Sequence, residues 1–304
     1  VALALHRSPT TILETITRRG LLPPEEPRRS TEECLSWLVG VAFGRFDIRV
    51  GLNPSLASPG VGIFDPLPVY SPGMLKRENG RSGGGKASDY PLALPSDPLL
   101  IDEPGHQWDI VTAVENAAKV VFHDPDAMLA QFEQVLGKDL REHFRRQFFR
   151  EHLGRYSKSG RKAPIYWQLT VPSRNWSVWL YAPSISREQL YAVGREGRRK
   201  ATGLLESVQR MRAEHSRAAG RDRRRIAERL AADEELAQEL TGFRSEIERI
   251  AESGWEPDLD DGIILCAAPL AELFPGWSDL VKERESIRKD EYPWATVSRW
   301  AKAL

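Results

Sequence analysis

Apolar residues recur at helical spacing over several stretches of the chain, and each stretch predicts an amphipathic helix. The first helix is predicted to start at Ser30-Thr31, which together with Glu33 resembles an N-cap followed by an acidic first turn. Gly40 and Gly44 follow within Val39–Asp47, where they would allow close packing or end the helix. Three further helices are predicted by the apolar stripes over Gln107–Val121, Pro125–Leu136 and Lys138–His152.

The pattern then changes to aromatic and β-branched residues over Ala163–Val171 and Asn175–Ala182, which predicts the two strands of a β-hairpin. Pro172-Ser173-Arg174 would form the turn between them. Alternation in the first strand places Tyr166 and Gln168 on the face opposite its tryptophan. These two side chains could face a ligand, although ordinary core packing also explains the aromatic residues.

Two long helical patterns follow, Ser186–Ser216 and Ala219–Ser253, and a turn around Ala218–Gly220 would join them into an antiparallel helical hairpin. A turn is then predicted at Asp260-Asp261-Gly262. The patterns together predict an α+β fold that is predominantly helical. Its helices surround a small β-hairpin or sheet, and the long antiparallel helical hairpin is added to them.

Proline and glycine are frequent between residues 51 and 105, which predicts a loop-rich segment that is mobile around "GRSGGGKAS" (Gly80–Ser88). We therefore divide the chain into four regions. They are a helix with a Pro/Gly-rich loop region (1–105), a helical and β-hairpin region (106–185), the helical hairpin (186–253) and a tail that packs back on the core (254–304).

Composition fits a globular protein of 304 residues, with 41% hydrophobic residues and no apolar run long enough to cross a bilayer. Cys34 and Cys266 are too few for a disulfide framework and are expected to be buried thiols, which fits a reducing cytoplasm. The first residue is Val1, and the start is too polar for a signal peptide, so we expect a further N-terminal portion.

The formal net charge is zero, but charge is strongly segregated along the chain. Over Arg141–Lys162 there are eight basic and two acidic residues, and over Arg195–Arg225 eleven basic and four acidic residues. Over Asp233–Asp261 eleven acidic residues accompany two basic ones. The two basic stretches therefore say more about partners than the total does.

Several catalytic motifs can be excluded from the residues present. "GRSGGGKA" has Ala87 where a phosphate-binding loop needs Ser or Thr, and no strand precedes it. Methyl transfer to adenine needs a Gly-rich cofactor turn and an Asn/Asp-Pro-Pro-aromatic loop, and neither occurs. His143 and His152 are spaced unlike paired metal ligands, so surface or cap roles are expected for them. The segment is therefore predicted to be non-catalytic and to hold no cofactor or metal.

Two basic segments remain as candidates for contact with nucleic acid. The first, with flexible Gly/Ser backbone and cations beside an aromatic strand, suits phosphate contact, but a solvated loop beside a core strand is an equally good interpretation. The second, at the end of the helical hairpin, is either a solvated face or a clamp on DNA. The candidate DNA-binding residues are Arg155, Tyr156, Ser157, Lys158, Ser159, Arg161, Lys162, Tyr166, Gln168, Arg223, Arg224 and Arg225.

The stretch "FFREHLGRYSKSGRKAPIYWQL" (Phe148–Leu169), followed by "SVWLY" (Ser177–Tyr181), resembles the C-terminal region of BREX/Pgl phage-defence adenine-specific DNA methyltransferases and related single-chain restriction–modification enzymes. Three further segments resemble that family in the same order along the chain. They are Leu38–Asp47, Phe64–Leu75 and Leu259–Pro275.

The resemblance implies a parent enzyme whose upstream catalytic domain uses S-adenosyl-L-methionine, and a C-terminal half that carries target recognition. It assigns Tyr156–Trp167 and the 106–185 region to that recognition part. The leading hypothesis is a module that binds double-stranded DNA and positions adenine for flipping into the upstream catalytic domain. The alternative is a non-catalytic scaffold that recruits other phage-defence proteins through the acidic helix Asp233–Ser253. An independent metal-dependent nuclease built on Asp258, Asp260 and Asp261 is a third possibility, for which a simple turn is sufficient explanation.

Overall fold

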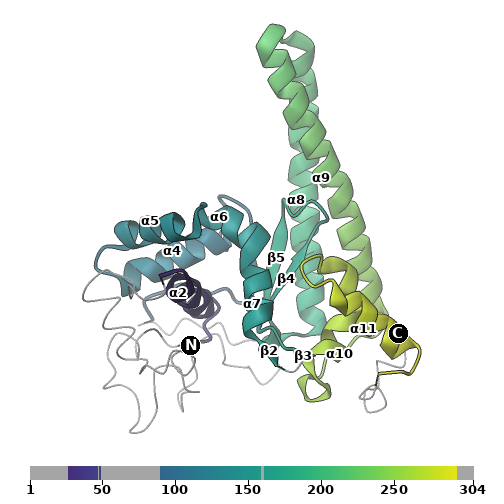
Figure 1. The fold of residues 1–304 in the computed structure, drawn as a ribbon. Coiled ribbons are helices and arrows are strands. Elements are labelled where there is room, and N and C mark those ends of the chain that lie inside the picture. The colour runs from purple at the N-terminus through teal and green to yellow at the C-terminus, as the bar shows by residue number, and fades with distance from the viewer. Residues whose placement is uncertain (1–26, 47, 49–89, 159–160, 293–304) are drawn as a thin grey trace. The chain divides into compact units, whose positions relative to one another are not determined.

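The computed structural model describes residues 27–46, 48, 90–158 and 161–292. Within them the protein is predominantly helical, with a small sheet and a long helical pair, as the sequence predicts (Figure 1). Contacts between residues divide the chain into two compact units. Unit 1 is Val1–Arg155 with Trp179–Ser184, and unit 2 is Tyr156–Val178 with Ile185–Leu304. These limits differ from the four regions expected from the sequence.

Unit 1 begins with α2 (Pro27–Ala42), which starts before the predicted cap at Ser30. Ser30 is a buried residue inside the helix and is therefore not its N-cap. At the other end Gly44 adopts the left-handed φ of 73°, and the Arg45 N–H donates to the Gly40 carbonyl at 2.8 Å. Of the two roles that the sequence left open for Gly44, the structure shows that it ends this helix, at a φ where a side chain is strained.

Two helices of unit 1 have boundaries that short-range signals determine. α4 (Ile110–Val121) starts after the predicted Gln107, because Asp109 is its N-cap and accepts from the Thr112 N–H at 3.2 Å. α5 (Pro125–Leu136) is found where proline and glycine predict it. Gly137 is its left-handed C-cap, with a φ of 71°.

The helix predicted over Lys138–His152 is a continuous helical run in three parts. They are α6 (Leu140–His143), the π-helical η2 (Phe144–Phe148) and α7 (Phe149–Arg155). Phe144, Phe148 and Trp179 are buried, and the Phe148 and Trp179 ring centroids lie 5.5 Å apart at an edge-to-face angle. The packing of large rings in unit 1 therefore includes a residue from the end of the β-hairpin.

The sheet has three strands in the order β1-β5-β4. They are β1 (Leu99–Ile101), β5 (Ser177–Tyr181) and β4 (Tyr166–Thr170). The turn of the β4–β5 hairpin places Arg174 at a φ of 61°, and the Arg174 N–H donates to the Val171 carbonyl at 2.9 Å. Every residue of β4 and β5 is buried, so both faces of the hairpin are covered.

Unit 2 is dominated by the helical hairpin of α8 (Arg187–Arg217) and α9 (Gly220–Glu252), which the sequence predicts almost residue for residue. Ser186 and Gln189 form a capping box at the start of α8. The hairpin extends away from the rest of unit 2 (Figure 1). Its base is held by buried apolar side chains, among them Phe243, whose ring centroid lies 5.4 Å from that of Trp176.

The tail forms four short helical segments in unit 2. They are η4 (Leu259–Asp261), α10 (Ile263–Ala267), η5 (Ala268–Leu273) and α11 (Asp279–Arg288). Asp258 accepts from the Asp260 N–H at 3.0 Å, and Gly262 has a φ of 106°, so this acidic segment is a turn. Trp255 is buried and donates from Nε1 to the Cys266 carbonyl at 3.2 Å.

Cys34 and Cys266 are both buried free thiols, as expected. Burial raises the pKa of each thiol to about 12, which makes them unreactive. In the described ranges no helix combines the length and the apolar character that crossing a bilayer requires. Most of the predicted loop over 51–105, with Gly80–Ser88, lies outside the described residues.

Candidate nucleic-acid interface

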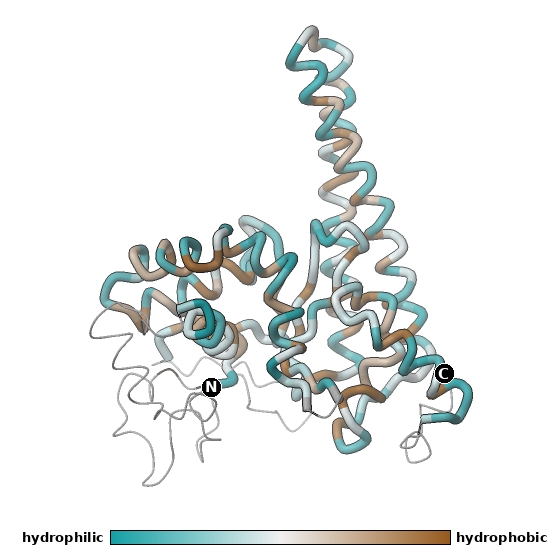
Figure 2. Tube along the Cα trace, viewed as in Figure 1, coloured by the Kyte–Doolittle hydropathy of each residue, from teal (hydrophilic) through white to brown (hydrophobic). Residues whose placement is uncertain are grey.

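The end of the α8–α9 hairpin is strongly basic. Residues 210–229, here called the hairpin tip, contain eight arginines and three carboxylates, a local charge of +5. The hairpin is described throughout, and in it Met211 is the last buried residue of α8 and Leu240 the first buried residue of α9. The tip is therefore two helices in contact with each other and otherwise exposed, and it is largely hydrophilic (Figure 2).

Three tip arginines have a carboxylate partner. The ion pairs are Arg212 with Glu234 (2.6 Å), Arg224 with Glu228 (3.1 Å) and Arg225 with Asp222 (3.6 Å). All of these side chains are at least two-fifths exposed, so solvent screens the pairs strongly. Such pairs hold their arginines only weakly, and Arg224 and Arg225 remain accessible at the surface as the sequence predicts.

The other five tip arginines are exposed and form no ion pair with any described residue. They are Arg210, Arg217, Arg221, Arg223 and Arg229. A guanidinium group carries five N–H donors in a planar fork that matches two phosphate oxygens. The tip thus presents several permanent cations whose hydrogen-bonding capacity is not used by any part of the chain that the structure describes.

Four of these five arginines lie in the basic segment Arg217–Arg229 that the sequence places at the end of the hairpin, and Arg223 is a named candidate. Arg210 lies outside that segment. A run of basic residues does not show which cations have a carboxylate within reach. One signal in the sequence is available: Arg221 has no acidic residue three or four positions away on either side. Arg210 has Glu214 and Glu206 at that spacing, so only the structure identifies it as unpaired.

The predicted basic loop forms a small antiparallel hairpin of β2 (Ser157–Lys158) and β3 (Arg161–Lys162). Ser157 pairs with Lys162, and Lys158 with Arg161. Lys162 Nζ donates to the Asp279 carboxylate, and this contact holds the pKa of Asp279 below its usual range. Ser159 and the side chains of Lys158 and Arg161 lie outside what the structure describes.

The residues that lead into this loop are also engaged. Arg155 ends α7, and its guanidinium lies 3.8 Å from the Glu32 carboxylate and donates to the Glu32 carbonyl at 3.4 Å. Tyr156 is half-buried, and its carbonyl accepts from the Ala163 N–H at 2.9 Å. Ser157 is exposed. The cations that can be described at this loop, Arg155 and Lys162, are thus both partly neutralised within the protein.

For Tyr166 and Gln168 the sequence left two possibilities, facing a ligand or packing in the core, and the structure shows them packed in the core. Tyr166 is fully buried and Gln168 is 5% exposed. Gln168 Nε2 donates to Ser177 Oγ at 3.4 Å, on the neighbouring strand. Alternation along the strand separates its two faces, but it does not show that both faces of β4 are buried. Neither side chain is available to a base edge in this conformation.

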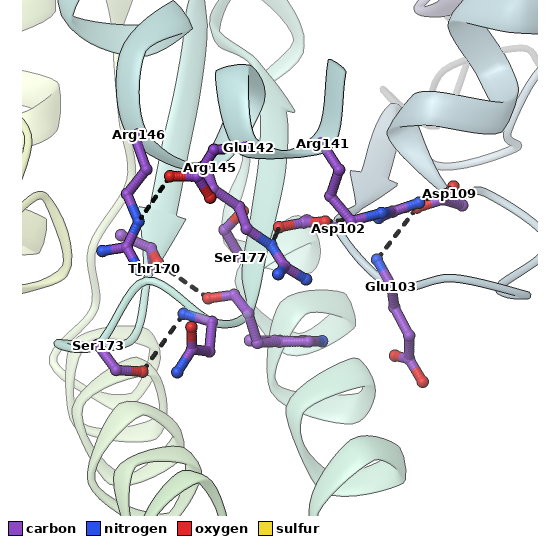
Figure 3. Close-up of polar contacts among 12 residues, drawn as sticks. Asp102, Glu103, Asp109, Arg141, Glu142, Arg145, Arg146, Thr170, Ser173 and Ser177 are labelled. Carbon is purple, nitrogen blue, oxygen red and sulfur yellow. Dashed lines mark hydrogen bonds and ion pairs between the residues drawn. The ribbon is translucent and has the colours of Figure 1, made fainter. Parts of the chain in front are cut away.

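The start of the first basic stretch forms a charge cluster inside unit 1. Arg141 lies between Asp102 and Asp109 (Figure 3), with N–O distances of 2.6 Å and 2.8 Å. Arg145 Nε contacts the second oxygen of Asp102 at 2.5 Å. Burial opposes ionisation of Asp109, but hydrogen bonds from Arg141 and Thr112 outweigh it and keep its pKa below the usual range. These arginines therefore stabilise the fold and are not free for a ligand.

His143 and His152 are buried, so the surface and cap roles expected from the sequence are wrong. Burial lowers the pKa of His143 to about 4, and it lowers the pKa of His152 well below the ordinary value. His143 lies 3.5 Å from the Glu151 carboxylate, which partly offsets the effect of burial. Both rings are packed against Phe148. The histidines were misassigned because their helix is covered on the side that carries them.

Comparison with known proteins gives no family assignment: no protein-family model matches the chain, and no curated protein matches it. No three or more His, Cys, Asp or Glu side chains come together as a metal site in the ranges that the structure describes. The phosphate-loop-like segment Gly80–Ala87 lies outside those ranges. The unpaired arginines of the hairpin tip are therefore the feature from which a function can be argued.

Proposed function

We propose that this protein binds double-stranded DNA through the hairpin tip. The observation that carries the proposal is the set of five exposed arginines that have no carboxylate partner among the described residues. Arginines that are not neutralised within the protein attract phosphate, and each phosphate contact releases condensed counterions from the duplex. Binding of this kind depends on charge and position and does not depend on base sequence.

The shape of the hairpin supports the same proposal. α8 has 31 residues, and at 1.5 Å per residue it is about 46 Å long. The tip arginines are carried at the far end of this rod from the buried base, where no other described element of unit 2 lies beside them (Figure 1). A projecting basic end can approach the phosphates of a duplex without any rearrangement of the core.

The ordered resemblance to phage-defence methyltransferases gives this activity a biological setting. In that setting the chain is the DNA-binding, target-recognition part of an adenine-specific DNA methyltransferase, and the catalytic domain with S-adenosyl-L-methionine lies upstream. The described segment performs no methyl transfer itself. It holds the duplex while an adenine is flipped into the upstream domain, and the protein acts in the cytoplasm.

The second candidate function is a scaffold that recruits other phage-defence proteins. Its support is the composition of α9 beyond the tip, where seven carboxylates accompany two arginines between residues 230 and 252. Several of these carboxylates, including those of Glu235 and Glu252, are exposed. An acidic helical face of this kind suits a basic protein partner better than it suits DNA.

The experiment is a titration of the full 304-residue chain with short duplex DNA over a series of salt concentrations, followed by fluorescence anisotropy. We expect log affinity to fall linearly with log salt, and the double variant Arg221→Gln/Arg223→Gln to reduce that slope by about 2. The matched control is Arg198→Gln/Arg249→Gln, which removes two exposed arginines that already have carboxylate partners near the hairpin base.

If log affinity stays constant as the salt concentration rises, the proposal is overturned. Equal losses in the tip variant and in the base control would also overturn it, because net charge alone would then explain the affinity. If the chain has no affinity for DNA but retains a protein partner, and the partner is lost when Glu235 and Glu252 are changed to Gln, the scaffold function is the correct one.

A further inference from the structure

A hollow of about 280 Å³ lies between α8 and α9 within the hairpin tip. Three arginines line it, Arg210 from α8 and Arg225 and Arg229 from α9. The two α9 arginines are one helical turn apart and so share a face of that helix. Three guanidinium groups from two helices therefore border the same small space.

The charge around this hollow is not balanced by the protein. Arg210 and Arg229 have no ion pair with any described residue, and Arg225 has only the exposed 3.6 Å contact with Asp222. The single acidic residue in the lining is Glu214. Like charges one turn apart on a helix destabilise it, so an anion placed between these arginines would relieve repulsion as well as gain attraction.

The remaining lining residues add an apolar side. Met211 is 8% exposed and Ile226 is half-buried, and both line the hollow with the arginines. Apolar surface beside a charge lowers the local dielectric, which strengthens attraction to an anion. Since one water molecule occupies about 30 Å³ of liquid, the hollow has room for more than a bare phosphate ion.

We infer that this hollow binds one phosphodiester of a nucleic-acid backbone. The phosphate oxygens accept hydrogen bonds from Arg210, Arg225 and Arg229, and the attached sugar packs against Met211 and Ile226. The inference rests on the proposed function, because it names the point of the hairpin tip at which the DNA backbone is held. The arginines at the very end of the tip, such as Arg221 and Arg223, then contact neighbouring phosphates from the exposed surface and bind them less tightly than the hollow does.

Glu214 has a defined effect in this arrangement. Its carboxylate borders the hollow and repels the phosphate, so it lowers the affinity of the site. The substitution Glu214→Gln keeps the size of the side chain and removes the charge. It is therefore expected to strengthen binding of phosphate and of DNA by about threefold, as removal of one exposed like charge would. A gain of affinity cannot arise from a misfolded variant.

The first measurement uses inorganic phosphate as the probe. Arginines of the full chain are modified with phenylglyoxal at increasing phosphate concentrations, and the sites are mapped by mass spectrometry. We expect phosphate to protect Arg210, Arg225 and Arg229 and to leave Arg221 and Arg223 reactive. Equal protection at all five, or at none of them, would overturn the inference.

The second measurement compares two double variants in the DNA titration. Arg210→Gln/Arg229→Gln is expected to weaken binding about tenfold more than Arg221→Gln/Arg223→Gln, although both remove two unpaired exposed arginines. Equal melting temperatures of the two variants show that the hairpin has formed in both. Equal losses of affinity in the two variants would contradict phosphate binding in the hollow, but DNA binding by the hairpin tip would still stand. If phosphate protects the three arginines but the chain has no affinity for DNA, the hollow is a phosphate site and the proposed function is wrong.

Discussion

The two basic stretches of this chain are similarly rich in arginine and lysine but have different physical roles. In the first, over 141–162, the cations whose side chains are described are largely committed to carboxylates: Arg141 and Arg145 to Asp102, and Lys162 to Asp279. In the hairpin tip five arginines have no such partner among the residues that the structure describes. A count of basic residues cannot separate these cases. What separates them is whether a carboxylate from elsewhere in the fold reaches the cation.

The sharpest test of the comparison is the substitution Arg141→Met. It leaves the buried Asp109 without its main cation, and breaking a buried ion pair on one side costs about 3–5 kcal/mol of unfolding free energy. Urea unfolding followed by circular dichroism measures the loss. The matched variant is Arg221→Gln at the tip, which is expected to change stability by less than about 0.5 kcal/mol. Comparable losses in the two variants would remove the distinction drawn between the stretches.

The stability of the fold should also depend on pH, because the first basic stretch contains a buried histidine. His143 is neutral in the folded protein down to about pH 4, whereas in the unfolded chain it takes up a proton near its ordinary pKa of 6.5. The unfolded state therefore binds more protons between these values, and the fold loses up to about 1.4 kcal/mol per pH unit as pH falls through that window.

The substitution His143→Gln should flatten this dependence, and His123→Gln, at an exposed histidine, should leave it unchanged. His152 contributes in the same direction, so some slope will remain in the first variant. Thermal unfolding at a series of pH values makes the comparison. A stability that stays constant from pH 7 to pH 4.5 in the unaltered chain would contradict the buried, neutral state of both rings.

The smallest effect is expected at Lys162. Its contact with Asp279 is an exposed ion pair, which contributes between about 0 and 1 kcal/mol, and that pair already offsets its charge. Lys162→Gln should therefore change duplex affinity less than either tip double variant does. Anisotropy titrations at one fixed salt concentration are sufficient. A loss as large as that of Arg210→Gln/Arg229→Gln would restore the β2–β3 loop as a DNA contact.

Local signals predict the elements of this fold well. Pro125 and Gly137 bound α5, Ser186 caps α8, and the break at Ala218–Ala219 separates two helices whose limits agree with the sequence pattern within a residue. Each of these features depends on residues within one or two turns of each other, which is the range over which hydrogen bonding and periodicity can be read from a sequence.

The candidate site is predicted less well because it depends on distant partners. Lys162 and Asp279 are 117 positions apart, and Arg145 and Asp102 are 43 apart, so no spacing in the sequence links them. The burial of Tyr166 and Gln168 likewise depends on what covers the second face of β4. The sequence marks the hairpin tip as basic and offers Arg223, Arg224 and Arg225 as candidates, but it does not show which arginines lack a partner, since that is a property of the folded chain.

Strand β5 affects when unit 1 can complete its packing during synthesis. The chain leaves unit 1 after Arg155 and returns to it at Trp179, whose ring contacts Phe144 and Phe148. During synthesis from the N-terminus, unit 1 therefore lacks part of its aromatic packing until the β-hairpin has left the ribosome. Fragments that stop before Trp179 should expose those rings, so a shortened expression fragment of unit 1 needs residues up to Ser184.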